Sequence, residues 1–261
     1  MTAPRLREKA RAGALALLPV GAIEQHGPHL PTGVDTLLAH EVALRIADLL
    51  DPIPGAVVAA AVPWGLSTHH MHFGGTQTLS LGTYRALLRD ICGSILRAGF
   101  QRIAIVNGHG GNISALSAIL TELADELPGA IAVTTYVNAT PDEFARILDR
   151  QSGIMHACEG ETSMMLAAHR DLVVTERLVD AHGPDCALLS DPVPVSLWRS
   201  FEEITATGVA GDARSATAEK GERMLAACSR RLAEELADER TWTRSRHIVA
   251  EDVEATSGGT R

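Results

Sequence analysis

Aromatic side chains are scarce in this sequence, because Phe, Tyr and Trp together make up 3% of its 261 residues. Hydrophobic residues nevertheless account for 46% of the chain, which provides enough apolar surface for a sizeable core. That core has to be built from Ala, Leu, Val and Ile. The length suits one α/β unit. We therefore expect a single domain over residues 1–246, followed by a mobile tail over residues 247–261.

Cysteine is also infrequent. Its four copies, Cys92, Cys158, Cys186 and Cys228, are far apart and form no CxxC pair, which argues against a zinc finger or a thioredoxin-like redox motif. Scattered cysteines fit a reducing cytoplasm. The apolar run at 14–20 follows a basic segment and faintly resembles a signal peptide, but it is short and leads directly into polar residues, so we interpret it as a strand.

Excess positive charge and long apolar runs are both missing. The net charge of −9 argues against nucleic acid or an anionic membrane as the main partner, since both bind basic patches. No apolar run approaches the ~20 residues that a membrane-spanning helix requires. We therefore expect a cytoplasmic protein whose partner is neither nucleic acid nor a membrane.

Short apolar runs alternate with amphipathic segments along the chain. We expect strands over residues 14–20, 56–62, 102–106 and 130–137, helices over residues 37–50, 84–98, 113–127, 141–150, 162–169 and 215–238, and a loop over residues 183–194. This alternation predicts a three-layer α/β/α fold with a mostly parallel central sheet. In such a fold the ligand site lies at the C-terminal ends of the strands.

Carboxylate and imidazole side chains gather after those strand ends. Glu24 and His26 are two residues apart, so both side chains point to the same side of an extended segment, and Asp35 follows nearby. His109 lies in a glycine-rich turn after the third strand, and Glu161 lies near the start of a helix. Mixed His and carboxylate ligation suits Zn, Mn or Fe(II) better than Mg or Ca. The sequence therefore predicts a divalent metal, or a pair bridged by Asp35, that activates water for hydrolysis.

Several of these residues have other interpretations. Asp35 by itself fits the N-cap of the following helix. The turn at 108–111 could hold a phosphate, although it lacks the Lys-Ser/Thr of a P-loop. Cys158 could act as a thiolate nucleophile with His156 as its base, but a cysteine is often a buried small hydrophobe. His156 is a better candidate for a general acid that protonates a leaving nitrogen, and its structural alternative is a hydrogen-bonded histidine.

A histidine tract at 69–72 follows the second predicted strand. We expect it at the rim of the same cleft, where Ser67 and His70 contact the substrate or support the metal ligands. Trp64, just before the tract, could supply an apolar wall of that cleft.

At this point five motifs are recognisable, in a fixed order: EQHGPHLP at 24–31 with Asp35; Ser67 and His70 with FGGTQTL at 73–79; NGHGGN at 107–112; HACEGETS at 156–163; and GVAGD at 208–212 with ATAEKG at 216–221. Through them the chain resembles the creatininase (creatinine amidohydrolase) family over residues 15–223. The resemblance implies an α/β fold, a two-metal centre of Zn or Mn, hydrolysis of cyclic or linear amide C–N bonds, and a homo-oligomer, often a hexamer.

The resemblance also implies roles for individual residues. Glu24, His26, Asp35 and His109 match metal ligands of the family, with Asp35 as the bridge. Glu161 matches an acid of the fourth motif, either a ligand or a partner of metal-bound water, and is catalytic together with His156. The substrate-binding residues that we expect are Trp64, Ser67, His70, Gly110 and Glu159.

One departure from the family concerns the third motif. Family members that hydrolyse creatinine have Tyr and Glu directly after the motif's His, and the Glu is a metal ligand. This chain has Gly110 and Gly111 there, which argues against creatinine and leaves the second metal one ligand short; Glu159 or Glu161 could compensate. His69 also stands where an acid is common.

Branches with the Gly-Gly version resemble formamide hydrolases of flavin or deazaflavin biosynthesis, or the peptidase that trims the mycofactocin precursor. Three hypotheses follow from the sequence. The first is an amidohydrolase for a small amide, the second is a peptidase for a modified peptide precursor, and the third is a metal-binding oligomer without turnover.

Overall fold

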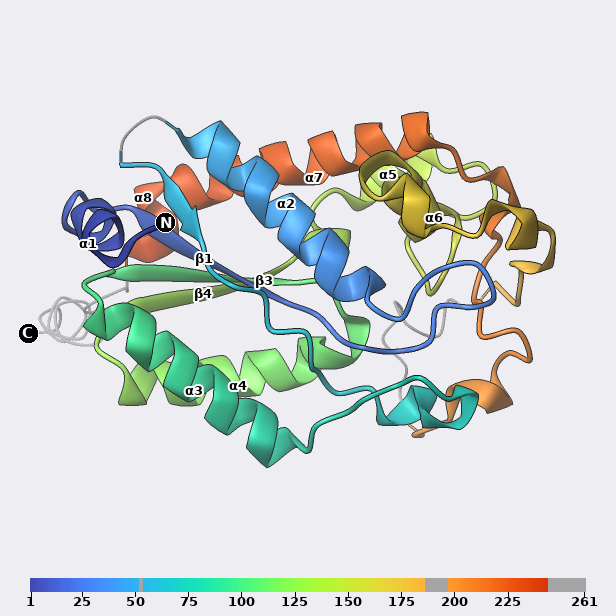
Figure 1. Ribbon diagram of the computed structural model, residues 1–261, viewed down its shortest axis with the longest axis horizontal. Coiled ribbons are helices and arrows are strands. Elements are labelled where there is room, and N and C mark those ends of the chain that lie inside the picture. Colours follow the sequence, from blue (N-terminus) through green and yellow to red (C-terminus); the bar gives the residue numbers. More distant parts are fainter. Residues whose placement is uncertain (52–53, 186–196, 244–261) are drawn as a thin grey trace, which may run out of the picture.

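The computed structural model describes residues 1–51, 54–185 and 197–243. At its centre is a parallel sheet in the order β2-β1-β3-β4. The strands are β1 (Leu15–Val20), β2 (Ala56–Val58), β3 (Arg102–Asn107) and β4 (Ala130–Thr135). Helices α2 (Val34–Leu50), α5 (Pro141–Ile147), α6 (Glu159–Ala168) and α7 (Ala218–Ala237) lie over one face, and α3 (Leu81–Arg97) and α4 (Ile113–Glu126) lie over the other (Figure 1). The predicted three-layer α/β fold with a parallel sheet is confirmed.

Both faces of the sheet are buried, which explains the continuous apolar runs in the sequence. Along β1, Leu15 and Leu17 pack toward α2 and α7. The alternating residues Ala16 and Leu18 pack toward α3 and α4. The core is mostly aliphatic, as the composition predicts, and several of the scarce aromatic residues are fully buried within it, including Tyr84.

Some element boundaries differ from the prediction. The helix expected from residue 37 begins at Val34 after Gly33 as its N-cap. Asp35 therefore lies inside the first turn, and its interpretation as an N-cap is wrong. The strand expected over 56–62 is regular only over Ala56–Val58, because Val62 forms only an isolated bridge with β1.

The remaining differences lie at helix ends. Helix α6 begins at Glu159, three residues before its predicted start, whereas α7 begins three residues after its predicted start. Helices α1 (Ala3–Arg11) and α8 (Glu239–Trp242) were not predicted. Most of the predicted loop at 183–194 and the whole predicted tail at 247–261 lie outside the described residues.

Within the described ranges no helix is both long and apolar enough to cross a membrane. Cys92, Cys158 and Cys228 are buried and form no disulfide. Cys186 lies outside the described residues.

Helices α6 and α7 approach each other closely at a glycine. A Cβ atom added at Gly221 would lie 1.9 Å from the carbonyl oxygen of Ser163, closer than any van der Waals contact allows. Helix α6 therefore keeps its position over the sheet only because α7 has no side chain at this point.

Replacing Gly221 by Ala is expected to lower the free energy of unfolding by about 1–3 kcal/mol, the usual cost of overpacking. The matched control is Gly82→Ala at the start of α3, where an added Cβ meets nothing within 4 Å. That control should gain up to about 1 kcal/mol from helix propensity. Urea denaturation of both variants measures the difference, and equal midpoints would contradict the close approach.

Candidate metal centre

The predicted ligands converge at the C-terminal end of the sheet. Glu24 and His26 follow β1, Asp35 projects from the first turn of α2, and His109 follows β3. Glu161, in the first turn of α6, joins them on the side of His26. All five side chains are buried. Segments far apart in the sequence are thus brought to one point by the parallel sheet.

The separations of these side chains suit bound cations. One oxygen of Asp35 lies 3.2 Å from His26 Nε2, and its other oxygen lies 3.1 Å from His109 Nδ1. Glu24 Oε2 is 3.3 Å from the same His109 nitrogen. Two ligand atoms that each lie about 2.1 Å from a tetrahedral Zn²⁺ are about 3.4 Å apart. Asp35 therefore faces two neighbouring positions, as a bridging carboxylate would.

Four atoms of this cluster lack hydrogen bonds. Glu24 Oε2, His26 Nε2, Asp35 Oδ2 and Glu161 Oε2 are each buried without a hydrogen-bonding partner among the described residues. A buried polar atom without a partner costs about 1–3 kcal/mol, and more when it is charged. Contacts of 3.1–3.3 Å between imidazole nitrogens and carboxylate oxygens of the cluster offset part of this cost. Buried carboxylates and imidazoles in this arrangement fit divalent metal ions.

The histidines are oriented for metal binding by their second nitrogens. His26 Nδ1 donates to the carbonyl oxygen of Glu24 at 3.1 Å, which leaves Nε2 facing Asp35. His109 Nε2 lies 3.2 Å from both the Leu66 carbonyl and Ser67 Oγ, which leaves Nδ1 facing the carboxylates. Such contacts fix the tautomer of metal-bound histidines. Ser67 thus contacts a predicted ligand, His109.

Asparagine side chains hold the loop that carries His109. Asn107 Oδ1 accepts from the backbone N–H of His109 at 3.2 Å, and its Nδ2 donates to the His109 carbonyl at 2.8 Å. Asn112 donates to the Gly21 carbonyl and accepts from the backbone N–H of Leu66. A Cβ at Gly108 would lie 2.2 Å from the carbonyl oxygen of Asp35, so this glycine permits a close backbone approach to α2 rather than a phosphate cradle.

The carboxylates and imidazoles of the cluster shift one another's pKa values. Burial, followed by the charges of Asp35 and Glu24, raises the pKa of Glu161 to about 7. Burial disfavours the charged form of His26, but Asp35, Glu161 and Glu24 outweigh it and raise the His26 pKa to about 9. The same burial would raise the pKa of Glu24, yet the imidazole of His109 above all holds it well below its usual range. Three carboxylates in one buried space favour any cation that enters.

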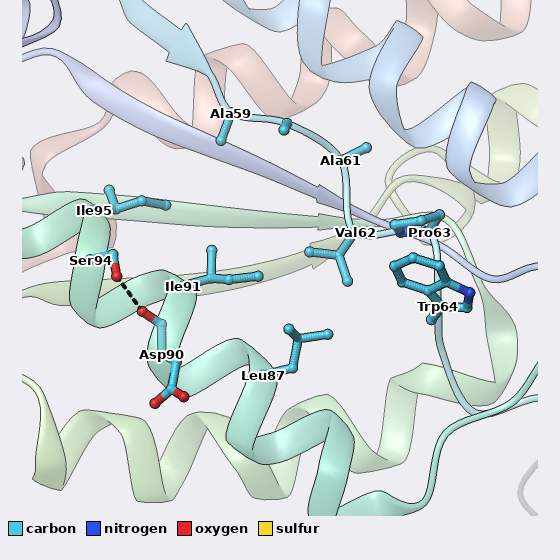
Figure 2. Close-up of a pocket in the computed structure, with 11 residues that line it drawn as sticks. Ala59, Ala61, Val62, Pro63, Trp64, Leu87, Asp90, Ile91, Ser94 and Ile95 are labelled. Atoms are coloured by element: carbon cyan, nitrogen blue, oxygen red, sulfur yellow. Dashed lines mark hydrogen bonds between the residues drawn. The ribbon is translucent and has the colours of Figure 1, made fainter. Parts of the chain in front are cut away.

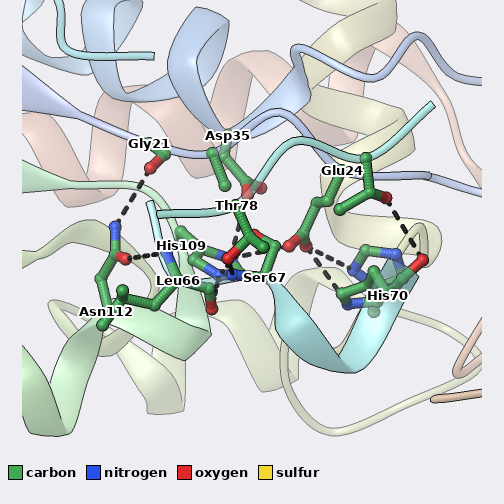
Figure 3. A network of polar contacts seen from close by, with 12 residues as sticks. Gly21, Glu24, Asp35, Leu66, Ser67, His70, Thr78, His109 and Asn112 are labelled. Atoms are coloured by element: carbon green, nitrogen blue, oxygen red, sulfur yellow. Dashed lines mark hydrogen bonds and ion pairs between the residues drawn. The ribbon is translucent and has the colours of Figure 1, made fainter. Parts of the chain in front are cut away.

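A second group of side chains lies on the other side of Glu24. His70 Nε2 and His156 Nδ1 are each 3.4 Å from Glu24 Oε1. Figure 3 shows Glu24 between His109 and His70. Gln25 Nε2 lies 2.9 Å from His70 and 3.1 Å from His156. The two predicted histidines therefore border the metal centre.

Phe201 closes this border, with its ring centroid 4.3 Å from that of His70 and 4.9 Å from that of His156. Neither Phe201 nor Gln25 was predicted from the sequence to have a role. Gln25 lies inside the first motif and could have been found there. Phe201 carries no local signal, since it comes from a 3₁₀ turn far along the chain.

Other predicted site residues lie away from the ligands. The buried carboxylate of Glu159 accepts from the backbone N–H groups of Asp149 and Arg150 and from Lys220 Nζ. Its oxygens are thus occupied by structural partners. Gly110 is exposed, and an added Cβ there would meet nothing within 4 Å.

Trp64 is 43% exposed and donates from Nε1 to Gln77 Oε1. It lies in a groove of about 480 Å³ between residues 59–64 and α3, whose Leu87, Ile91 and Ile95 face it (Figure 2). None of the residues that line this groove belongs to the ligand cluster.

Cys158 is fully buried and accepts from the backbone N–H of Met155. Burial raises its pKa to about 11, so it remains a thiol at neutral pH. Since the thiolate is the nucleophilic form, this environment opposes the nucleophile interpretation. The preceding Ala157 has φ of +51°, which is uncommon for a residue other than Gly or Asn and turns the chain from His156 into α6.

Comparison with known proteins agrees with the family resemblance of the sequence motifs. A sequence profile of the creatininase family, described as creatinine amidohydrolase, matches residues 1–236. The mycofactocin precursor peptide peptidase of Mycolicibacterium smegmatis is 35% identical over 214 residues, which cover 81% of this chain and 80% of that protein. The creatinine amidohydrolase of Pseudomonas putida is 31% identical over 246 residues, which cover 88% of this chain and 91% of that protein.

Among solved structures, a crystal structure of creatinine amidohydrolase superimposes with a TM-score of 0.77 and 29% identity, covering 94% of this chain and 97% of that one. The similarity in sequence and in fold thus extends over most of both chains. The chain belongs to the creatininase family of amidohydrolases, enzymes that hydrolyse carbon–nitrogen bonds.

Proposed function

We propose that this protein is a metal-dependent amidohydrolase with a two-ion centre. The observation that carries the proposal is the convergence of buried carboxylate and imidazole atoms of Glu24, His26, Asp35 and His109, which lie 3.1–3.3 Å apart. Creatininase structures that match this fold include one named as a Zn-Zn type and one named for Mn. Zn²⁺ or Mn²⁺ is therefore the cofactor that we assign to the cluster.

Metal binding and proton transfer are assigned to different residues. Glu24, His26, Asp35 and His109 would hold the ions, which would polarise an amide carbonyl and activate water. Glu161 has a pKa of about 7, which suits a group that takes a proton from water and returns it to the leaving nitrogen.

His156 has a different role from the predicted general acid. Burial holds its pKa well below the usual range, so its imidazole is neutral. We therefore assign His156, with His70, to the substrate side of the centre and the proton transfer to Glu161.

A second candidate concerns the substrate. Cleavage of an amide bond in a peptide precursor is favoured by the 35% identity to a mycofactocin precursor peptide peptidase. A small amide or formamide remains the first candidate.

Removal of the metal tests the function directly. After chelation and dialysis, hydrolysis of a panel of creatinine, lactams, formamides and peptide amides is expected to stop, and added Zn²⁺ or Mn²⁺ should restore it. Released amine and metal content per chain are measured on the same samples. Full activity with far less than one ion per chain would rule out the mechanism. Bound ions without turnover of any panel member would favour the non-catalytic hypothesis.

We also propose that the protein forms a homo-oligomer, a hexamer in particular. Light scattering on the same preparation, with and without added metal, measures the mass of the oligomer.

A further inference from the structure

Gln25 is a buried polar side chain that the proposed mechanism does not use. Its amide oxygen accepts from the backbone N–H of Gly27 at 2.8 Å. Its amide nitrogen donates to the carbonyl oxygen of Gly208 at 3.1 Å and lies 2.9 Å from Nδ1 of His70. Both hydrogens of the amide nitrogen thus have an acceptor, and the amide oxygen has a donor.

These contacts allow only one orientation of the Gln25 amide. Exchanging its oxygen and nitrogen would place the oxygen against the Gly208 carbonyl and the NH₂ group against the Gly27 N–H, which replaces two hydrogen bonds by two repulsive contacts. The group that faces His70 is therefore an N–H donor. Since a ring nitrogen that accepts a hydrogen bond carries no proton, the proton of the neutral His70 ring has to be on Nε2.

The backbone carbonyl of Gln25 fixes a second imidazole. It lies 2.7 Å from Nε2 of His156, and because a carbonyl oxygen only accepts, this ring nitrogen has to carry a proton. Gln25 Nε2 is 3.1 Å from the same ring nitrogen, but both groups are then donors and form no hydrogen bond with each other. The neutral His156 ring is left with a lone pair on Nδ1.

The two histidines therefore present unlike groups to one carboxylate. His70 Nε2 and His156 Nδ1 are each 3.4 Å from Glu24 Oε1, with His70 visible beside Glu24 in Figure 3. The centroids of the two rings are 4.3 Å apart. Both rings carry their proton on Nε2, yet His70 presents this N–H to Glu24 whereas His156 presents its unprotonated Nδ1.

We propose that Gln25 is a positioning residue, which holds His70 as a hydrogen-bond donor and His156 as an acceptor toward Glu24. This inference rests on the proposed function. With its proton on Nδ1 instead, His70 would present a lone pair, as His156 does. Two lone pairs would then face the same carboxylate oxygen, and their repulsion would displace Glu24, a proposed metal ligand.

Neutron diffraction from crystals of the Zn²⁺-loaded protein in D₂O locates these protons directly. We expect deuterium on Nε2 but not on Nδ1 of His70, and deuterium on Nε2 of His156. Deuterium on Nδ1 of His70 would overturn the proposal, whatever the activity of the protein.

Gln25→Glu reverses the contact with His70, because a carboxylate only accepts. Deuterium is then expected on Nδ1 of His70. For the member of the amide panel that the wild type hydrolyses fastest, kcat should fall at least about 10-fold, the lower end of the effect of hydrogen-bonding partners around a metal ligand. Metal content should keep its wild-type value. Gln25→Met removes the donor without adding a charge and should lower kcat in the same range, so it keeps the test decisive if Gln25→Glu does not fold.

The matched control is Gln77→Glu. Gln77 is exposed and accepts from Trp64 Nε1, which a carboxylate can also do, so kcat and the protons of His70 should not change. Wild-type kcat in the Gln25 variants would overturn the positioning role and leave the metal-dependent function intact. A lower kcat in Gln25→Glu with deuterium still on Nε2 alone of His70 would do the same. A wild-type protein without metal-dependent hydrolysis would overturn the proposed function and the positioning role together.

Discussion

Replacing Asp35 by Asn is expected to remove both ions and to lower kcat/KM for amide hydrolysis by at least about 1000-fold, which corresponds to about 4 kcal/mol of lost transition-state stabilisation. The reason is geometric. The two oxygens of Asp35 face His26 and His109 at 3.2 and 3.1 Å, so the substitution weakens both metal positions at once. Metal content and steady-state kinetics measure the effect.

The matched control for this substitution is Asp48→Asn. Asp48 lies on the same helix, is exposed, and belongs to no ligand group. Its replacement should leave metal content and kcat/KM unchanged. An Asp35→Asn variant that retains two ions would contradict the bridging role.

Replacing Lys220 by Met is expected to lower the free energy of unfolding by about 3 kcal/mol. Its ammonium group contacts Glu159 Oε1 at 2.5 Å, and Glu159 is fully buried. Removal of one partner of a buried pair leaves the other charge uncompensated, which typically costs 3–5 kcal/mol. Two backbone N–H groups still bind Glu159, so we place the loss at the lower limit. Chemical denaturation measures it.

Two further variants separate the buried charge from simple loss of packing. Adding Glu159→Gln to Lys220→Met should recover more than half of the lost stability, because no buried charge remains. Arg231→Met on the same helix breaks only an exposed pair with Glu235 and should change stability by less than about 1 kcal/mol. A double variant as unstable as Lys220→Met alone would show that the pairing is unimportant.

The sheet and its larger helices could be predicted from the sequence because their apolar patterns are strong. Every residue of β1 is buried, and such a run has few other interpretations. Helix α1 was missed because only Ala10 of its residues is buried and only Leu6 packs beside it against the core, which is too short an apolar pattern to reveal a helix. The end of β2 could not be placed, since pairing with β1 and not local propensity decides where an edge strand stops.

The candidate site, like the fold, could be predicted from the sequence only in part. The meeting of four side chains could be predicted because they follow strand ends, and the ends of parallel strands share one edge of the sheet. These are Glu24, His26, Asp35 and His109. Glu159 stands two residues from Glu161 and has the same chemistry, yet its function is decided by Lys220, 61 residues away.

Such relations between distant segments have no local pattern, so a sequence without its structure does not reveal them.

The spread of the ligands along the chain has a consequence for biosynthesis. Glu24, His109 and Glu161 come from widely separated segments, and the start of α6 that carries Glu161 is held by Lys220 near the beginning of α7. A nascent polypeptide that has emerged only as far as β4 has neither Glu161 nor its support. The complete site, with Glu161 in place beside the metal ligands, can therefore assemble only late in synthesis, after α6 and α7 have emerged from the ribosome.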